Sequence, residues 1–157
     1  MRRITYAIEF HRPAGATPHG EPEPIAASNV TISATTVPGG ASETQEYARA
    51  VLHAAPRVNP DFTFTERGYV VFGNPEENNR LSFSSIGLGF MKAYECPEKR
   101  FTAGAVMWGI DSGSGFFEGA AGAITANFLI DTTLKDEHNK PLPGELISYQ
   151  FGVVYLP

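Results

Sequence analysis

Residues 111–131, DSGSGFFEGAAGAITANFLID, decide the fold. Gly113 and Gly115 can take a positive φ without the steric penalty of a Cβ atom, so residues 111–115 predict a turn. From residue 123 onward the sequence alternates, with one face made of Ile124, Ala126, Phe128 and Ile130 and the other of Thr125, Asn127, Leu129 and Asp131. A period of two indicates a β-strand. A glycine- and alanine-rich bend that leads into a strand is typical of a corner in a small antiparallel barrel.

The same patterns predict further strands on both sides of this stretch. They are expected over residues 3–11, 29–37, 61–73, 80–94, 101–110 and 145–156. Residues 13–24 contain four prolines and two glycines and predict a loop over one mouth of the barrel. Residues 42–55 favour a short helix, because Ser42 and Gln45 have the form of a capping box and Pro56 follows. The alternative for this segment is another strand.

Length and composition restrict the class of protein. The 157 residues suit one domain spanning residues 1–157, and a charged fraction of 18% with a net charge of −5 gives no basic face for nucleic acid. The single cysteine, Cys96, excludes an intrachain disulfide. No signal peptide and no apolar run long enough to cross a bilayer is visible, so we expect a cytoplasmic protein without a membrane partner.

Few residues carry a recognisable chemical pattern. The four histidines are scattered, no pair has metal-ligand spacing, and no nucleotide or nucleophile motif occurs, so we expect neither a metal nor a cofactor. Glu9 and His11 remain, two residues apart on one face of the first strand. Either they are solvated while Ile4, Tyr6, Ile8 and Phe10 fill the core, or they face a lumen while that apolar row packs against another subunit.

Residues 113–122, GSGFFEGAAG, resemble the G-[GS]-G-x-F-E-G-A-x-G segment of allene oxide cyclases, small barrels related to dirigent proteins and to bacterial barrel-shaped cyclases. Residues 149–157, YQFGVVYLP, are similar to the closing strand of that family. Together with the strand pattern, the resemblance implies an all-β, antiparallel closed β-barrel of about eight strands, of the allene oxide cyclase or calycin-like kind, with one short helix.

The resemblance also implies roles for individual residues. The family carries a Glu-x-Asn pair that faces the lumen of its first strand, and here Glu9 matches the glutamate while His11 replaces the asparagine. By analogy, Glu9 is expected to be the base or the electrostatic partner of the substrate. His11 is expected to donate a hydrogen bond or to carry a proton.

Later strands offer further candidates for a substrate-binding lumen. Trp108 could form a flat aromatic wall, and the remaining candidates share outer or inner faces of two strands: Thr125 and Asn127, and Tyr149, Phe151 and Tyr155. The alternative for Trp108 is a place in the core, and for the other residues a place in the core or in a subunit interface.

These patterns lead to one expected function and two alternatives. We expect a cofactor-independent cyclase or isomerase that holds a small hydrophobic molecule in the lumen and restricts it to one reactive shape. A non-catalytic, lipocalin-like carrier or sensor is the first alternative, and an interaction protein with a filled lumen is the second. An apolar outer row on the first strand would also favour a homo-oligomer, either a dimer or a trimer.

Overall fold

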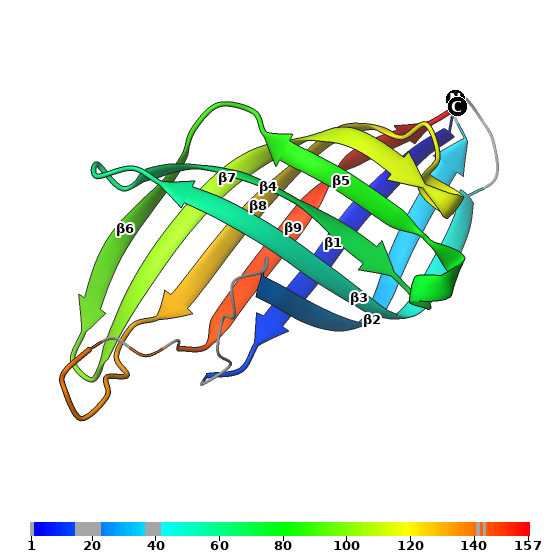
Figure 1. Cartoon of the computed structure of the whole chain (residues 1–157). Helices are drawn as coiled ribbons and strands as arrows, with labels where there is room; N and C mark the ends of the chain where they lie inside the picture. The colour runs from blue at the N-terminus through cyan, green and yellow to red at the C-terminus, as the bar shows by residue number, and fades with distance from the viewer. Residues whose placement is uncertain (1, 15–22, 37–41, 141, 143) are drawn as a thin grey trace.

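The computed structural model describes residues 2–14, 23–36, 42–140, 142 and 144–157 of the chain. Most of these residues lie in nine β-strands (Figure 1). The strands are β1 (Arg2–Arg12), β2 (Glu23–Thr36), β3 (Ser42–Val58), β4 (Thr63–Phe72), β5 (Arg80–Ser85), β6 (Gly89–Cys96), β7 (Lys99–Ser114), β8 (Ala121–Asp131) and β9 (Leu146–Leu156).

The strands form a closed antiparallel barrel. Hydrogen-bonded neighbours follow the order β3-β2-β1-β9-β8-β7-β5-β4, and β3 also pairs with β4, which closes the ring. β5 and β6 share the position between β4 and β7, because β5 pairs with one part of each neighbour and β6 with the other. The predicted β-barrel is therefore confirmed, although it has nine strands where about eight were expected.

Alternation along each strand separates the interior from the outer surface. In β1, Ile4, Ile8 and Phe10 are buried, whereas Thr5, Ala7, Glu9 and His11 are exposed. The same period places apolar residues of β3, β4, β5, β7, β8 and β9 inside the barrel. Its buried members include Leu52, Phe64, Val70, Phe72, Leu81, Phe83, Val106, Trp108, Phe117, Ile124, Ala126, Val154 and Leu156.

Aromatic side chains of β4, β5, β7 and the turn before β8 pack together inside the barrel. Phe117 packs on Phe72 with ring centroids 4.8 Å apart, and Phe83 stacks on Trp108 at 3.8 Å. Phe117 belongs to a 3₁₀ turn, η2 (Gly115–Phe117), that joins β7 to β8. We call these four residues the aromatic plug. The stretch that predicted the corner therefore also supplies one of the largest side chains of the core.

The corner itself begins later than the sequence predicts. Residues 111–114 continue β7, and the chain turns only from Gly115, which has φ +59°. A Cβ atom at Gly115 would lie 2.5 Å from Oδ1 of Asn79. That oxygen accepts a hydrogen bond from the backbone N–H of Phe116 at 2.8 Å, so the side chain of Asn79 holds the turn in place.

The predicted helix over residues 42–55 is wrong, because this segment belongs to β3. Ala50 and Leu52 are buried in the barrel, and their spacing is that of a strand. Pairing with both β2 and β4 outweighs the weak helical pattern. Pro56 is accommodated two residues beyond Ala54, the last residue of β3 that pairs with β2, where a missing N–H breaks no ladder on that side.

Other segments differ from expectation in their boundaries. The run over residues 80–94 is divided into β5 and β6, and Gly87 between them has φ +78°. The run over residues 61–73 fits either a hairpin or one bent strand by its sequence, and in the structure Thr63–Phe72 form the single strand β4. β2 begins at Glu23 rather than at residue 29. Most of the loop expected at residues 13–24 lies outside the described residues. Among the described residues, no helix is long and apolar enough to cross a membrane.

Replacing Phe117 with alanine is expected to lower the free energy of unfolding by about 3–5 kcal/mol, because it would leave a cavity beside Phe72. Unfolding in urea, followed by the fluorescence of Trp108, measures this loss. Leu88→Ala is the control: its side chain is 62% exposed, so the change should stay within about 0.5 kcal/mol. Equal losses in the two variants would contradict a stabilising role for the aromatic plug.

Candidate functional site

The two residues expected to be catalytic lie on the outer surface. His11 is exposed, with its Nε2 atom 2.7 Å from Oε1 of Glu145. Glu9 pairs across the strands with Tyr149 and accepts a hydrogen bond from its hydroxyl group, which raises the pKa of Tyr149. The arrangement with Glu9 and His11 facing a lumen is therefore wrong. The larger and more apolar neighbours, Ile8 and Phe10, take the interior positions.

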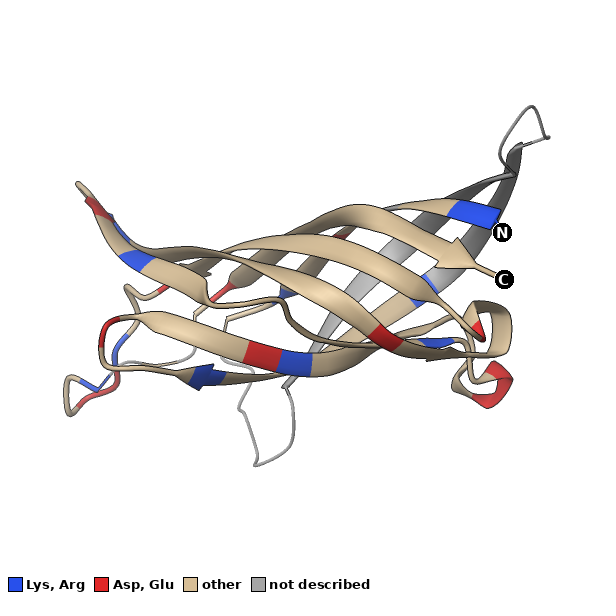
Figure 2. Ribbon diagram, turned by 90° about the horizontal axis from the view of Figure 1, so that it is seen from above, with Lys and Arg blue, Asp and Glu red and all other residues tan. Residues whose placement is uncertain are grey.

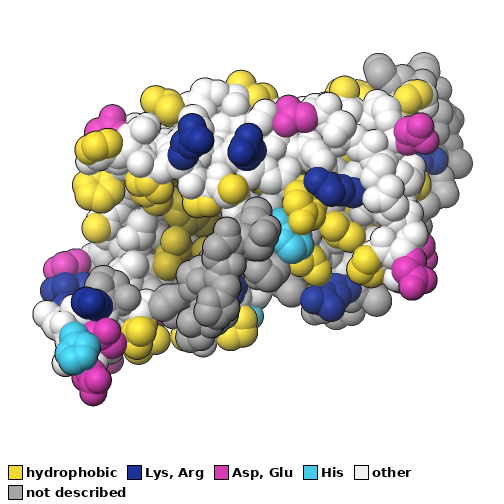
Figure 3. Space-filling view, viewed as in Figure 1, with side chains coloured by type: hydrophobic (Ala, Val, Ile, Leu, Met, Phe, Trp, Pro, Cys, Tyr) yellow, Lys and Arg dark blue, Asp and Glu magenta, His cyan; other side chains and the backbone are white. Residues whose placement is uncertain are grey.

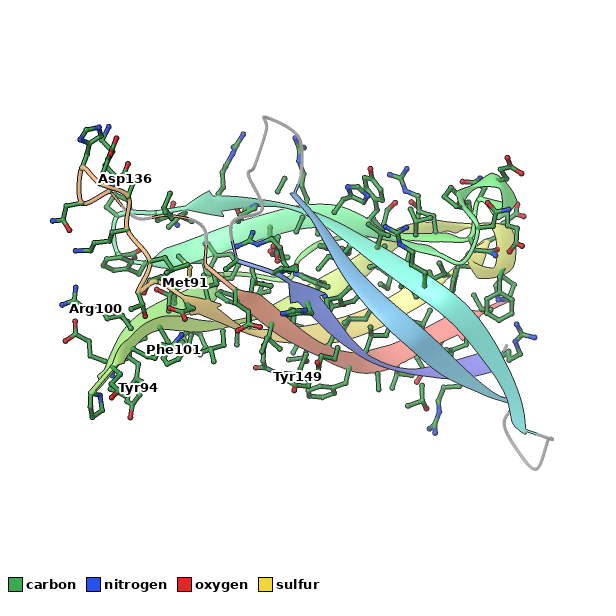
Figure 4. The ribbon with its side chains drawn as sticks, turned by 90° about the horizontal axis from the view of Figure 1, so that it is seen from below. Met91, Tyr94, Arg100, Phe101, Asp136 and Tyr149 are labelled. Carbon is green, nitrogen blue, oxygen red and sulfur yellow. The ribbon has the colours of Figure 1, made fainter. Side chains whose placement is uncertain are left out.

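Four of the five expected substrate-binding residues also point outward. Asn127 pairs with Tyr149 and Thr125 with Phe151, so all four share the outer face of β8 and β9. Asn127, Tyr149 and Phe151 are exposed and Thr125 is half-buried. Figure 4 shows Tyr149 pointing away from the barrel. A lumen position is wrong for these four residues, because the inward positions of these strands fall on their even-numbered residues.

Trp108 is the one expected binding residue that lies inside. Its side chain is 1% exposed, and its indole stacks on Phe83 with an angle of 13° between the rings. The indole N–H donates a hydrogen bond to Oε2 of Glu66, 3.0 Å away. Trp108 is therefore held both by stacking and by a polar contact at its edge.

Glu66 on β4 is a carboxyl group on the inward side of the barrel that the sequence analysis did not single out. Its backbone N–H donates to Oγ of Ser85 at 2.6 Å, and the same hydroxyl lies 2.9 Å from the carbonyl oxygen of Glu66. Ser85 in turn pairs with Trp108 across β5 and β7. The neighbouring strands β4, β5 and β7 thus bring Glu66, Ser85 and Trp108 together.

A signal for Glu66 is present in the sequence of β4, TFTERGYVVF. Phe64, Glu66, Gly68, Val70 and Phe72 share one face at period two, so a glutamate interrupts an otherwise apolar row. A charged residue in such a row is seldom buried without a partner. Its place in that row, rather than any motif, distinguishes it from the solvated Glu9.

The surroundings of Glu66 change its acidity. Burial raises the pKa of Glu66 from 4.5 to about 7, and the hydrogen bond from Trp108 opposes this shift only in part. A carboxyl group with this pKa is present in both its neutral and its ionised form near neutral pH. It can therefore both donate and accept a proton, as general acid–base catalysis requires.

A pocket of about 240 Å³ leads to Glu66 from the outside, where β3, β4 and β5 meet. Its lining residues are Ala55, Arg57, Thr65, Glu66, Arg67, Ser84 and Ser85. Arg57 and Arg67 lie diagonally across the β3–β4 pair, because Arg57 pairs with Thr65 and Arg67 is two residues further along. The carboxyl group is therefore accessible to water and to small polar molecules from this side.

The end of the barrel away from the chain termini is less completely filled. Met91, Phe128 and Leu146 are hydrophobic residues that are only partly buried against the core at this end. Figure 3 shows a hollow in this part of the surface with hydrophobic side chains on its floor. Ser148 and Gln150 of β9 add buried polar side chains to the same interior. We call this region the apolar hollow.

Comparison with models of protein families, with curated proteins and with solved structures found no significant match to this chain. The likeness of residues 113–122 to the allene oxide cyclase segment is therefore still a prediction. Among the described residues, no group of three or more His, Cys, Asp or Glu side chains is arranged to hold a metal ion. The site consists of Glu66, Ser85 and Trp108, with the apolar hollow in the same interior.

Glu66 is expected to make the stability of the protein depend on pH. Because its pKa in the folded state is raised from 4.5 to about 7, the folded state keeps a proton that the unfolded chain releases between these values. The resulting stabilisation is complete below pH 4.5 and is lost as the pH rises through about 7. From the shift alone, this loss amounts to at most about 3 kcal/mol.

Glu66→Gln removes the titrating group, while the amide oxygen can still accept the hydrogen bond from Trp108. Unfolding in urea at about pH 5 and about pH 8 should show the loss for the natural chain and a smaller one for the variant. The fluorescence of Trp108 should titrate with a midpoint near the pKa of Glu66 only in the natural chain. Identical pH profiles for both proteins would contradict the assigned pKa.

Proposed function

We propose that this barrel binds a compact, mostly apolar molecule in the apolar hollow and isomerises or cyclises it without a cofactor, with Glu66 as the proton-transferring group. The observation that carries the proposal is an inward carboxyl group held by the indole of Trp108 in an interior lined mainly by apolar side chains. The sequence resemblance of residues 113–122 to barrel-shaped cyclases supports the same reaction class.

Glu66 supplies the proton chemistry in this proposal. Its ionised form accepts a proton from a carbon or oxygen atom of the substrate, and the resulting neutral acid returns the proton at another atom of the same molecule. The transfer balances within one substrate and needs neither an oxidant nor a reductant. The hydrogen bond from Trp108 fixes the carboxyl group in position and stabilises its ionised form.

The barrel interior supplies orientation and the exclusion of water. Phe64 and Phe128 meet edge to face at 5.8 Å and form an apolar wall that can restrict a flexible molecule to one folded shape. The largely buried position of Glu66 also strengthens the electrostatic effect of its carboxyl group on developing charge. These effects agree with a reaction that depends more on conformation than on a strong nucleophile.

A non-catalytic carrier is the second candidate, and the aromatic plug favours it. The large, fully buried rings near Trp108 leave less room for a reaction than for one end of a bound molecule. Both candidates require a ligand in the same interior. They differ only in whether the ligand leaves chemically changed.

Glu66→Gln is expected to lower kcat by about 10²–10⁴, the usual contribution of a general acid–base group. Native mass spectrometry of the protein from its own host would identify a co-purifying molecule, and chromatography after incubation would report its conversion. Glu9→Gln and His11→Ala are matched controls on the outer surface and should keep full turnover.

Two outcomes would contradict the catalytic proposal. Unchanged ligand after incubation with the natural chain would favour the carrier. Loss of turnover in Glu9→Gln, with Glu66→Gln active, would move the chemistry to the outer surface.

A further inference from the structure

The outer face of β7, β8 and β9 carries an unusual amount of exposed apolar surface. Residues 101–110, 121–130 and 146–156 contain no charged side chain. Figure 2 shows that most of the barrel wall is uncharged and that many of the charged residues lie toward its ends. Seven large apolar side chains on β6–β9 are between 39% and 63% exposed, namely Phe90, Tyr94, Met107, Leu129, Tyr149, Phe151 and Tyr155.

This face has a relief of one ridge and two troughs. Tyr149, Phe151 and Tyr155 form a ridge along β9, because they alternate on its outer side. On β8, the neighbouring outward positions are small, with Ala123 opposite Val153 and Thr125 opposite Phe151. On β1, Ala7 lies opposite Phe151 and Thr5 opposite Val153. A concave surface of about 620 Å³ follows this relief and is lined by residues of β1, β8 and β9.

We propose that two copies of this chain associate through the outer faces of β8 and β9, with the β9 ridge of each copy in the β8 trough of the other. A two-fold axis parallel to the strands and between β8 and β9 places each β9 over the other copy's β8. Because Phe151 and Thr125 are paired within one chain, this axis sets Phe151 of each copy against Thr125 of the other. The face is thus complementary to itself.

The size and chemistry of the face favour a second copy as the occupant. At about 150–250 Å² for a complete large side chain, Met107, Leu129, Tyr149, Phe151 and Tyr155 present roughly 500 Å². The small outward residues of β1 and β8 add to this area, toward the ~800 Å² per partner of a stable interface. An uncharged sheet face offers no charge pattern that would select a different partner. Aligned packing of two such sheets about 10 Å apart buries their facing side chains. This inference does not depend on the chemistry of Glu66.

The proposed interface differs from the one expected from the sequence, which was formed by the apolar row of β1. Ile4, Ile8 and Phe10 of β1 are buried in the core and are not available for another subunit. In its place, the residues expected to bind a substrate, Thr125, Tyr149 and Phe151, become contacts between the two copies. Asn127 lies between Leu129 and Thr125 on the same face.

Sedimentation equilibrium of the full chain tests the proposal, with a mass of two chains expected. Phe151→Asp and Thr125→Lys should each raise the dissociation constant of the dimer at least about thirtyfold, as the loss of a central contact does. Because each single variant would place two like charges in the interface, mixing the two variants should restore a dimer. Leu134→Asp, at an exposed apolar position outside this face, should not change the association.

Several results would overturn the proposal. A single-chain mass for the natural protein at all concentrations would exclude the association, and a three-chain mass would exclude the two-fold arrangement. Failure of the mixed variants to associate would exclude the contact between Phe151 and Thr125. Circular dichroism of each variant verifies that the barrel is still folded, and Tyr155→Asp provides a second ridge variant with the same expected loss.

Discussion

The packing of aromatic rings across the barrel interior is the constraint on which the rest of this structure depends. Several glycines on the strands lie where a ring needs room. A Cβ atom at Gly104 would lie 2.3 Å from the ring of Phe128, and one at Gly89 would lie 2.6 Å from the ring of Phe64. These glycines therefore serve close packing, as a glycine in a strand often does where another group approaches. The barrel can close only because large and small residues face each other.

The same packing creates the chemical properties of Glu66. A carboxyl group at this position loses most of its water, which disfavours the ionised form. Phe83 holds the indole ring of Trp108, so that its N–H points at the carboxylate oxygen. One contact thus both fills the core and orients the donor. A mutation that loosened the rings would allow water in and return the acidity of Glu66 toward that of an exposed glutamate.

Most strands could be predicted from the sequence, but the side that each strand turns inward was harder to assign. In β1 the apolar residues alternate with Glu9 and His11, and this alternation correctly predicts a strand. It does not say which face is inside, because a core would take the apolar residues and a ligand-binding lumen could take Glu9 and His11. In β9 both faces are apolar, so periodicity alone could not choose Gln150 over Tyr149 and Phe151 for the interior. Closure of the ring makes that choice, because neighbouring strands must present their inward residues at the same level. Glu66 could be found from its row on β4, whereas its partner Trp108 depends on long-range pairing.

The error at β3 has a related cause. Its helical spacing is a local signal, whereas its strand structure is stabilised by pairing with β2 and β4, which lie outside the segment that carries this spacing. The two apolar surfaces of the barrel follow from the same non-local closure. The chain is 42% hydrophobic, and a closed ring of strands can hide only one face of each strand. Packing of the aromatic rings buries the apolar inner face. The uncharged outer face of β8 and β9 is still exposed, and burying its apolar side chains against another surface would be favourable.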